Sequence, residues 1–166
     1  MSSAKDGAVP SGPLPKLNDV RIAIVTAEWN RHITGRLLDS AVSLIRSEGY
    51  DVDCFDVPGT VELTFGASAL IEESLFDAVI AFGCVVRGDT PHFDYVCQSV
   101  TQGITALNAD CDTPVIFGVL TVENEAQALD RIAQADGRPG PAGDKGREAA
   151  EAAIKMVAFK RALASL

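Results

Sequence analysis

From residue 20 onward, the chain alternates short apolar runs with longer amphipathic stretches. Four of the apolar runs have the length and the content of Val, Ile and Phe that are typical of buried strands. These runs are Arg21–Thr26, Asp51–Val57, Asp77–Cys84 and Pro114–Leu120. Such an alternation is the pattern of a parallel sheet covered by helices, so we expect a single α/β domain.

The stretches between and after these runs repeat apolar residues at helical spacing or are rich in helix formers. The expected helices are residues 33–45 ahead of Gly49, Glu62 to about Ser74, Phe93–Leu107, Glu125–Ala135 and Arg147–Leu163. The Gly- and Pro-rich segment Asp136–Gly146 is interpreted as a loop. In a right-handed βαβ arrangement, the segments that follow the strands gather at one edge of the sheet, where α/β proteins bind ligands.

With 166 residues and 47% hydrophobic content, the chain has the size and composition of one globular domain. Its longest apolar run, Ala78–Val86, is too short for a membrane helix, which needs about 18 such residues. Residues 1–18 have no apolar stretch of signal-peptide length, so we expect a flexible N-terminal arm there and the domain in residues 19–166.

Acidic residues outnumber basic ones by 23 to 14, which gives a net charge of -9 and leaves no basic surface for nucleic acid or an anionic membrane. A small molecule or another protein is the expected partner. The four cysteines, Cys54, Cys84, Cys97 and Cys111, lack C-x-x-C spacing, and three of them lie in or beside apolar segments. Buried reduced thiols are the expected state, which favours the cytoplasm.

The chain lacks a dinucleotide-binding fingerprint, a P-loop lysine and a G-x-S-x-G motif. It has only two histidines, His32 and His92, so a multi-histidine metal site is not expected. The residues alone therefore favour an α/β domain that works without a metal or cofactor.

The segment after the third strand predicts a helix start, with Thr90 as N-cap, Pro91 at the first helical position and Asp94 in the first turn. His92 falls in the same turn, where the helix terminus disfavours the charged imidazolium and so favours a proton acceptor. This terminus, with Arg87 beside it, could also hold a phosphate. The alternative is that His92 and Arg87 are ordinary solvated surface residues.

Trp29 follows the first strand in a polar loop, where its ring could stack on a heteroaromatic ligand or pack onto the next helix. Glu62 suits either a ligand contact or a helix start. Taken singly, Phe117 favours a core position and Arg131 a solvated helix face. Together these residues suggest proton transfer on a phosphorylated small molecule.

Three blocks in this order carry a family resemblance: Val57–Leu63 (VPGTVEL), Gly83–Val96 (GCVVRGDTPHFDYV) and Pro114–Asn124 (PVIFGVLTVEN). Over about residues 20–158 the chain resembles the 6,7-dimethyl-8-ribityllumazine synthase family. The resemblance implies a three-layer α/β/α sandwich with a flavodoxin-like four-stranded parallel sheet. It also implies a riboflavin-biosynthesis transferase that condenses 5-amino-6-(D-ribitylamino)uracil with 3,4-dihydroxy-2-butanone 4-phosphate, without metal or organic cofactor.

The resemblance further implies the residues that bind the pyrimidine substrate. Trp29 would stack on the pyrimidine ring. The ribityl chain would be bound by Thr60, Val61 and Glu62. The heterocycle would lie along Cys84, Val85 and Val86, and both sets of contacts would be made largely through backbone groups. Val61 stands where many members of the family carry an aromatic residue, so its packing contribution differs from theirs.

For the second substrate, the resemblance implies that Asp89 and Thr90 meet the butanone phosphate and that His92 transfers protons. Phe117 and Arg131 would reach the site from a neighbouring subunit, with the planar guanidinium of Arg131 on the phosphate.

The connection between Arg131 and Lys145 is longer and richer in Gly and Pro than the short form found in sixty-subunit members. In this family a long connection is associated with pentamers, so the expected assembly is a homopentamer or a decamer. The competing hypothesis is a non-catalytic flavin- or lumazine-binding oligomer on the same scaffold, for which Trp29 would supply the stacking surface.

Overall fold

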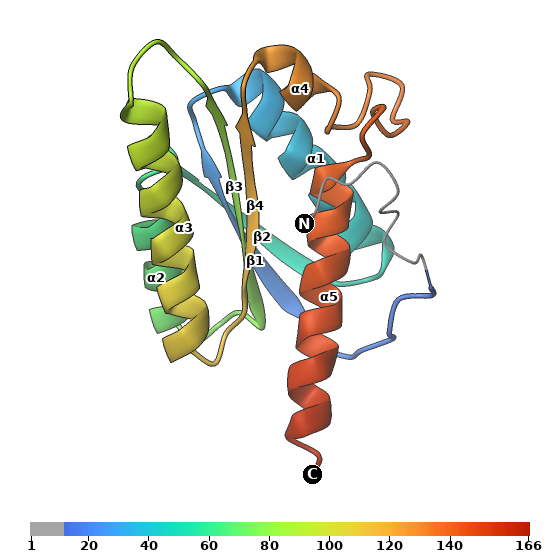
Figure 1. The fold of residues 1–166 in the computed structure, drawn as a ribbon. Helices are drawn as coiled ribbons and strands as arrows, with labels where there is room; N and C mark the ends of the chain where they lie inside the picture. The colour runs from blue at the N-terminus through green and yellow to red at the C-terminus, as the bar shows by residue number, and fades with distance from the viewer. Residues whose placement is uncertain (1–11) are drawn as a thin grey trace.

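The computed structural model describes residues 12–166, in which one sheet of four parallel strands forms the centre of the molecule (Figure 1). The strands are β1 (Arg21–Ala27), β2 (Asp51–Val57), β3 (Ala78–Val86) and β4 (Val115–Val122). They pair in the order β2-β1-β3-β4, so β1 and β3 are central and β2 and β4 are the edges.

Helices cover both faces of this sheet. They are α1 (Arg31–Ser47), α2 (Leu63–Glu72), α3 (His92–Asp110), α4 (Glu125–Leu129) and α5 (Lys145–Leu163). Figure 1 shows α2 and α3 on one side of the sheet and α1 and α5 on the other, with the short α4 at the end of β4. The predicted three-layer α/β/α sandwich is therefore confirmed.

The central strands are buried on both faces, and this explains why they are continuous apolar runs. In β1, Ile22 and Ile24 join the core formed with α1 and α5, whereas Ala23 and Val25 join the core under α2 and α3. The edge strand β2 is different, because none of its seven residues is buried.

The fourth helix is much shorter than the prediction of Glu125–Ala135, because α4 ends at Leu129. The carbonyls of Asp130 and Arg131, which would have continued the helix, accept hydrogen bonds from the backbone N–H groups of Ala142 (2.8 Å) and Lys145 (2.9 Å). The segment that leads into α5 thus uses the carbonyls that would accept hydrogen bonds in a longer α4.

The expected arm, residues 1–18, lies partly outside the described residues, which begin at Gly12. Residues 12–18 have no regular secondary structure, but Leu14 and Leu17 pack against the core of α1 and α5. The Tyr50 hydroxyl accepts a hydrogen bond from Leu17 N and donates one to the Pro15 carbonyl. This segment is therefore attached to the domain.

All four cysteines are free, and only Cys84 among them is buried. The expectation of buried thiols is wrong for Cys54, which lies exposed on β2, because β2 is an edge strand without a covering layer. No helix within residues 12–166 is long and apolar enough to cross a membrane.

Candidate active site

Trp29 and Glu62 meet at the carboxyl edge of the sheet, against the backbone of Gly59. A Cβ placed on Gly59 would lie 3.0 Å from Glu62 Oε2 and 3.5 Å from Trp29 Cδ1. Trp29 is 73% exposed, so it does not pack as a staple onto α1 in this chain. An exposed indole beside a carboxylate offers a flat surface for a ring and an acceptor for hydroxyl groups.

Thr60 lies on the end of β3. Its side chain is buried, and its Oγ1 would be 3.0 Å from a Cβ at Gly83. The Thr60 carbonyl accepts a hydrogen bond from Leu63 N at the start of α2. Val61, in the same turn, is 45% exposed. The loop after β2 is therefore seated on β3 at Thr60, while Val61 and Glu62 face solvent.

The end of β3 passes from buried Cys84 to half-buried Val85 and Val86. Burial raises the pKa of the Cys84 thiol to about 12, with a smaller contribution from the nearby Glu125 carboxylate. The thiol is therefore protonated at neutral pH and is not a nucleophile, because only the thiolate reacts. This stretch offers a ligand backbone groups and apolar surface.

Asp89, Thr90 and His92 are all exposed at the start of α3. The prediction that Thr90 caps this helix is wrong by one residue, because Pro91 holds the N-cap position and no side chain caps the helix. Pro91 has helical angles (φ -62°, ψ -5°), and its carbonyl accepts from Asp94 N at 3.0 Å. The first turn of α3, which follows the loop that holds Asp89 and Thr90, therefore has no side-chain cap.

Arg87 does not offer a free cation for a phosphate. Its guanidinium bonds to Glu123 (Nε to Oε2, 2.7 Å) and Asp94 (Nη2 to Oδ1, 3.2 Å), and it stacks over the Phe93 ring at 4.1 Å. The hydrogen bonds that Arg87 donates to Asp94 and Glu123 raise the pKa of its guanidinium. Arg87 instead connects the end of β3, the first turn of α3 and the loop after β4.

Phe117 and Arg131 do not join the other site residues within one chain. Phe117 pairs in register with Ala81, five residues before the end of β3. At about 3.3 Å per residue, that is about 16 Å from the carboxyl edge. Both residues, together with Lys145, line a hollow of 190 Å³ along the outer edge of β4. β3 separates this hollow from Trp29 and Glu62.

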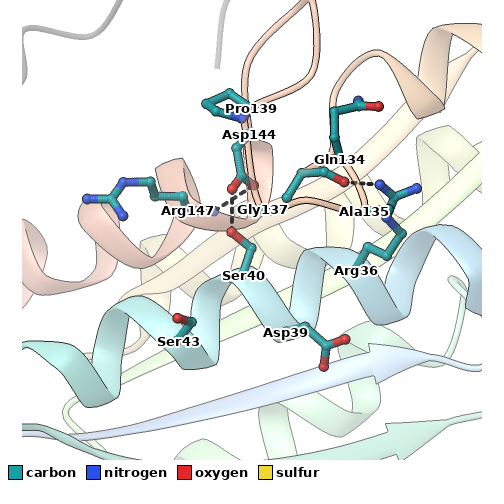
Figure 2. A pocket seen from close by; sticks show the side chains of 11 residues that line it. Arg36, Asp39, Ser40, Ser43, Gln134, Ala135, Gly137, Pro139, Asp144 and Arg147 are labelled. Carbon is teal, nitrogen blue, oxygen red and sulfur yellow. Dashed lines mark hydrogen bonds between the residues drawn. The ribbon is translucent and has the colours of Figure 1, made fainter.

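A larger hollow, of about 620 Å³, lies elsewhere, between α1 and the connection that leads into α5 (Figure 2). Figure 2 shows that the Ser40 hydroxyl donates to the Asp144 carboxylate. Arg36 donates to the backbone carbonyl of Ala133. Asp144 Oδ1 also accepts from the N–H groups of Gly146 and Arg147. We interpret this hollow as a structural junction that attaches the long connection to α1.

The 6,7-dimethyl-8-ribityllumazine synthase family model matches residues 19–161. The chain belongs to this family. The 6,7-dimethyl-8-ribityllumazine synthases of Phocaeicola vulgatus and Porphyromonas gingivalis are each 50% identical to it, over 90% and 93% of this chain and 88% and 91% of the relative. That of Parabacteroides distasonis is 52% identical over 88% of this chain and 89% of the relative. The predicted resemblance is confirmed.

Three residues of this lumazine synthase family member contact the candidate site residues but were not predicted from the sequence: Asn30, Gly59 and Gly83. Asn30 has a left-handed backbone (φ 59°, ψ 41°), and its Nδ2 donates to the Cys84 carbonyl at 2.8 Å. Gly59 and Gly83 are the close-contact points for Trp29 and Thr60. An Asn directly before a helix and glycines at strand ends were the available signals, but the partners are distant in sequence.

Proposed function

We propose that this chain catalyses the condensation of 5-amino-6-(D-ribitylamino)uracil with 3,4-dihydroxy-2-butanone 4-phosphate in riboflavin biosynthesis. Membership of the family supports the activity. The observation that carries its assignment to this site is the junction at Gly59, where an exposed indole and a carboxylate lie together at the carboxyl edge of the sheet. A flat heterocycle with a polyhydroxyl chain matches that pair of groups.

In this proposal the pyrimidine half of the site lies on the loops after β1 and β2 and on the end of β3. The pyrimidine ring stacks on Trp29, whose exposed face is available for it. The ribityl chain binds to Thr60, Val61 and Glu62, and the heterocycle lies along Cys84, Val85 and Val86.

The phosphate half lies at the start of α3, with Asp89 and Thr90 beside the butanone phosphate. The amine of the pyrimidine attacks the ketone, and loss of water gives the imine. Elimination then breaks the C–O bond to phosphate, the ring closes and a second water leaves. His92 accepts and returns the protons of these steps, in the first turn of a 19-residue helix.

We also propose that the chain works as a homopentamer or a decamer with sites between subunits. The position of Phe117 and Arg131 supports this, because they line the β4 edge, across β3 from Trp29. Phe65 on α2 and Tyr95 on α3 are 79% and 69% exposed, on the same face of the sheet (Figure 1). A second copy would cover such an aromatic surface. The four free thiols suit the cytoplasm.

A second candidate function is non-catalytic binding of a flavin or a lumazine. The exposure of Trp29 favours it as well, because an indole also stacks on a tricyclic ring. The two candidates differ in turnover. Lumazine formation from the two substrates supports the enzyme, whereas tight binding of a yellow ligand without product formation supports the binding protein.

The decisive experiment compares His92→Ala with the wild type in the two-substrate assay. We expect a loss of about a hundredfold in kcat, the contribution of one general acid–base group, with pyrimidine binding little changed. His32→Ala is the matched control, because His32 is the other histidine and its side chain pairs with Glu125. Unchanged turnover in His92→Ala, or an equal loss in His32→Ala, would remove His92 from the mechanism.

A further inference from the structure

Trp29 lies between two residues that are each hydrogen-bonded to a neighbouring strand. Glu28 N donates to the Val57 carbonyl at the end of β2, at 2.9 Å. Asn30 Nδ2 donates to the Cys84 carbonyl near the end of β3, at 2.8 Å. Trp29 therefore lies between two residues that connect the end of β1 to β2 and to β3, although its own side chain is largely exposed.

The hydrogen bond from Asn30 satisfies a carbonyl of β3 that lies beyond the last residue paired with β1. The register of β1 with β3 ends at Thr26 and Phe82, two residues before Cys84. Beyond that point the Cys84 carbonyl is satisfied by the Asn30 amide. A buried carbonyl needs such a partner, so this bond holds the loop after β1 against β3.

The backbone of Asn30 is equally constrained. Its left-handed conformation (φ 59°, ψ 41°) is one that Asn tolerates better than most residues. Its carbonyl accepts from Ile33 N (2.8 Å) and Thr34 N (3.0 Å), which begins α1. As the N-cap residue it makes no side-chain cap bond to its own helix, although Asn commonly does. Its amide is used between elements instead.

We propose that Asn30 is a positioning residue, which holds Trp29 in place for stacking on the pyrimidine substrate by tying the loop after β1 to the end of β3. The inference rests on the proposed function for its substrate. A mobile exposed indole would have to be ordered when the ligand binds, and prior ordering by Asn30 removes that cost.

The test uses Asn30→Asp, which keeps the size and the left-handed backbone but removes the N–H donor. We expect the KM for the pyrimidine to rise about tenfold, the worth of one such hydrogen bond, while the KM for the butanone phosphate changes less than about twofold. Trp29 is the only tryptophan, so time-resolved fluorescence anisotropy reports its motion alone. The amplitude of the fast depolarisation is expected to increase. Asn30→Gly gives a second variant with the same expectation, should Asn30→Asp fold poorly.

Asn108→Asp is the matched control. Asn108 Nδ2 donates to the Val115 carbonyl at 2.9 Å, so the change removes the same type of bond at the amino end of β4. It is expected to lower stability without changing Trp29 motion or the pyrimidine KM. Unchanged anisotropy in both Asn30 variants, or equal effects in Asn108→Asp, would overturn the proposal. If the wild type forms no lumazine, the proposed function fails, and anisotropy alone decides whether Asn30 holds Trp29.

Discussion

At the scale of single residues, the candidate site depends on a glycine, Gly59, as well as on the side chains beside it. Gly59 does not have a positive φ, so a side chain is disfavoured there by the lack of space and not by the backbone conformation. Glu62 Oε2 and Trp29 Cδ1 occupy the space that a side chain at this position would enter. The distance between the indole and the carboxylate is therefore sensitive to one methyl group.

Gly59→Ala should weaken binding of the pyrimidine substrate without lowering the stability of the domain. The added methyl would come within 3.0 Å of Glu62 Oε2 and force that carboxylate to move. We expect the KM for the pyrimidine to rise by about threefold to tenfold, or roughly 1 kcal/mol, with the free energy of unfolding unchanged or higher because alanine restricts the unfolded chain. Steady-state kinetics and urea unfolding measure the two quantities.

The control for this change is Gly35→Ala. Gly35 lies within α1, and the nearest atom to its added Cβ is Arg31 Nε at 3.9 Å. The change should stabilise the helix by up to about 1 kcal/mol and leave the pyrimidine KM unaltered. A rise in KM no larger for Gly59→Ala than for this variant would contradict the crowding argument.

At the scale of elements, the helices next to the site begin in different ways. The N-cap residue of α3 is Pro91, which has no side-chain cap bond, and that of α1 is Asn30, whose side chain bonds to β3 instead. The N-cap residue of α5 is the buried Asp144, whose Oδ1 accepts from Gly146 N and Arg147 N at 3.1 Å each. The helix that follows the long connection thus has a side-chain cap, whereas the first turns of α1 and α3 have none.

Asp144→Ala is expected to destabilise the domain. It removes the cap of α5, worth about 1 kcal/mol, and it also leaves the Ser40 hydroxyl without its acceptor, so we expect a loss of about 2 kcal/mol. The midpoint of urea unfolding measures this loss. Asn124→Ala, which removes the cap of the five-residue α4, should cost less. Equal losses in the two variants would show that the Asp144 junction adds nothing beyond an ordinary cap.

At the scale of the whole molecule, the residues proposed for the site lie in two places on one chain. Those proposed for the pyrimidine, together with His92, follow strands β1, β2 and β3, whereas Arg131 lies with Phe117 in the hollow along β4. The exposed aromatic residues on α2 and α3 and the uncovered strand β2 offer surface for neighbouring copies. A ring of identical chains would bring the Arg131 of one to the His92 of the next.

Subunit mixing tests this arrangement. His92→Ala and Arg131→Ala should each lose most turnover, but unfolding the two together and refolding them should restore activity. With random assembly at equal ratio, roughly a quarter of the sites would combine an intact His92 with an intact Arg131 from the neighbour. Light scattering on the same samples gives the particle mass. If both residues served the site of their own chain, no mixture would exceed the separate variants.

The order and type of the elements follow from local pattern. The central strands were predicted to within two residues, because buried strands such as 78–86 are continuous apolar runs and the helices between them have a period that excludes strands. The short α4 could not be predicted in this way. Its end is set by bonds from Ala142 and Lys145 to Asp130 and Arg131, more than ten residues apart.

The sequence by itself determined the α/β class, the order of strands and helices along the chain and the resemblance that led to the family, because these are carried by neighbouring residues and by short motifs. Only the tertiary structure decided that Trp29 is exposed beside Gly59, that Arg87 is occupied by carboxylates and that Arg131 lies across β3 from Trp29. Each of these depends on contacts between residues from different strands or loops. Folding alone brings such residues together.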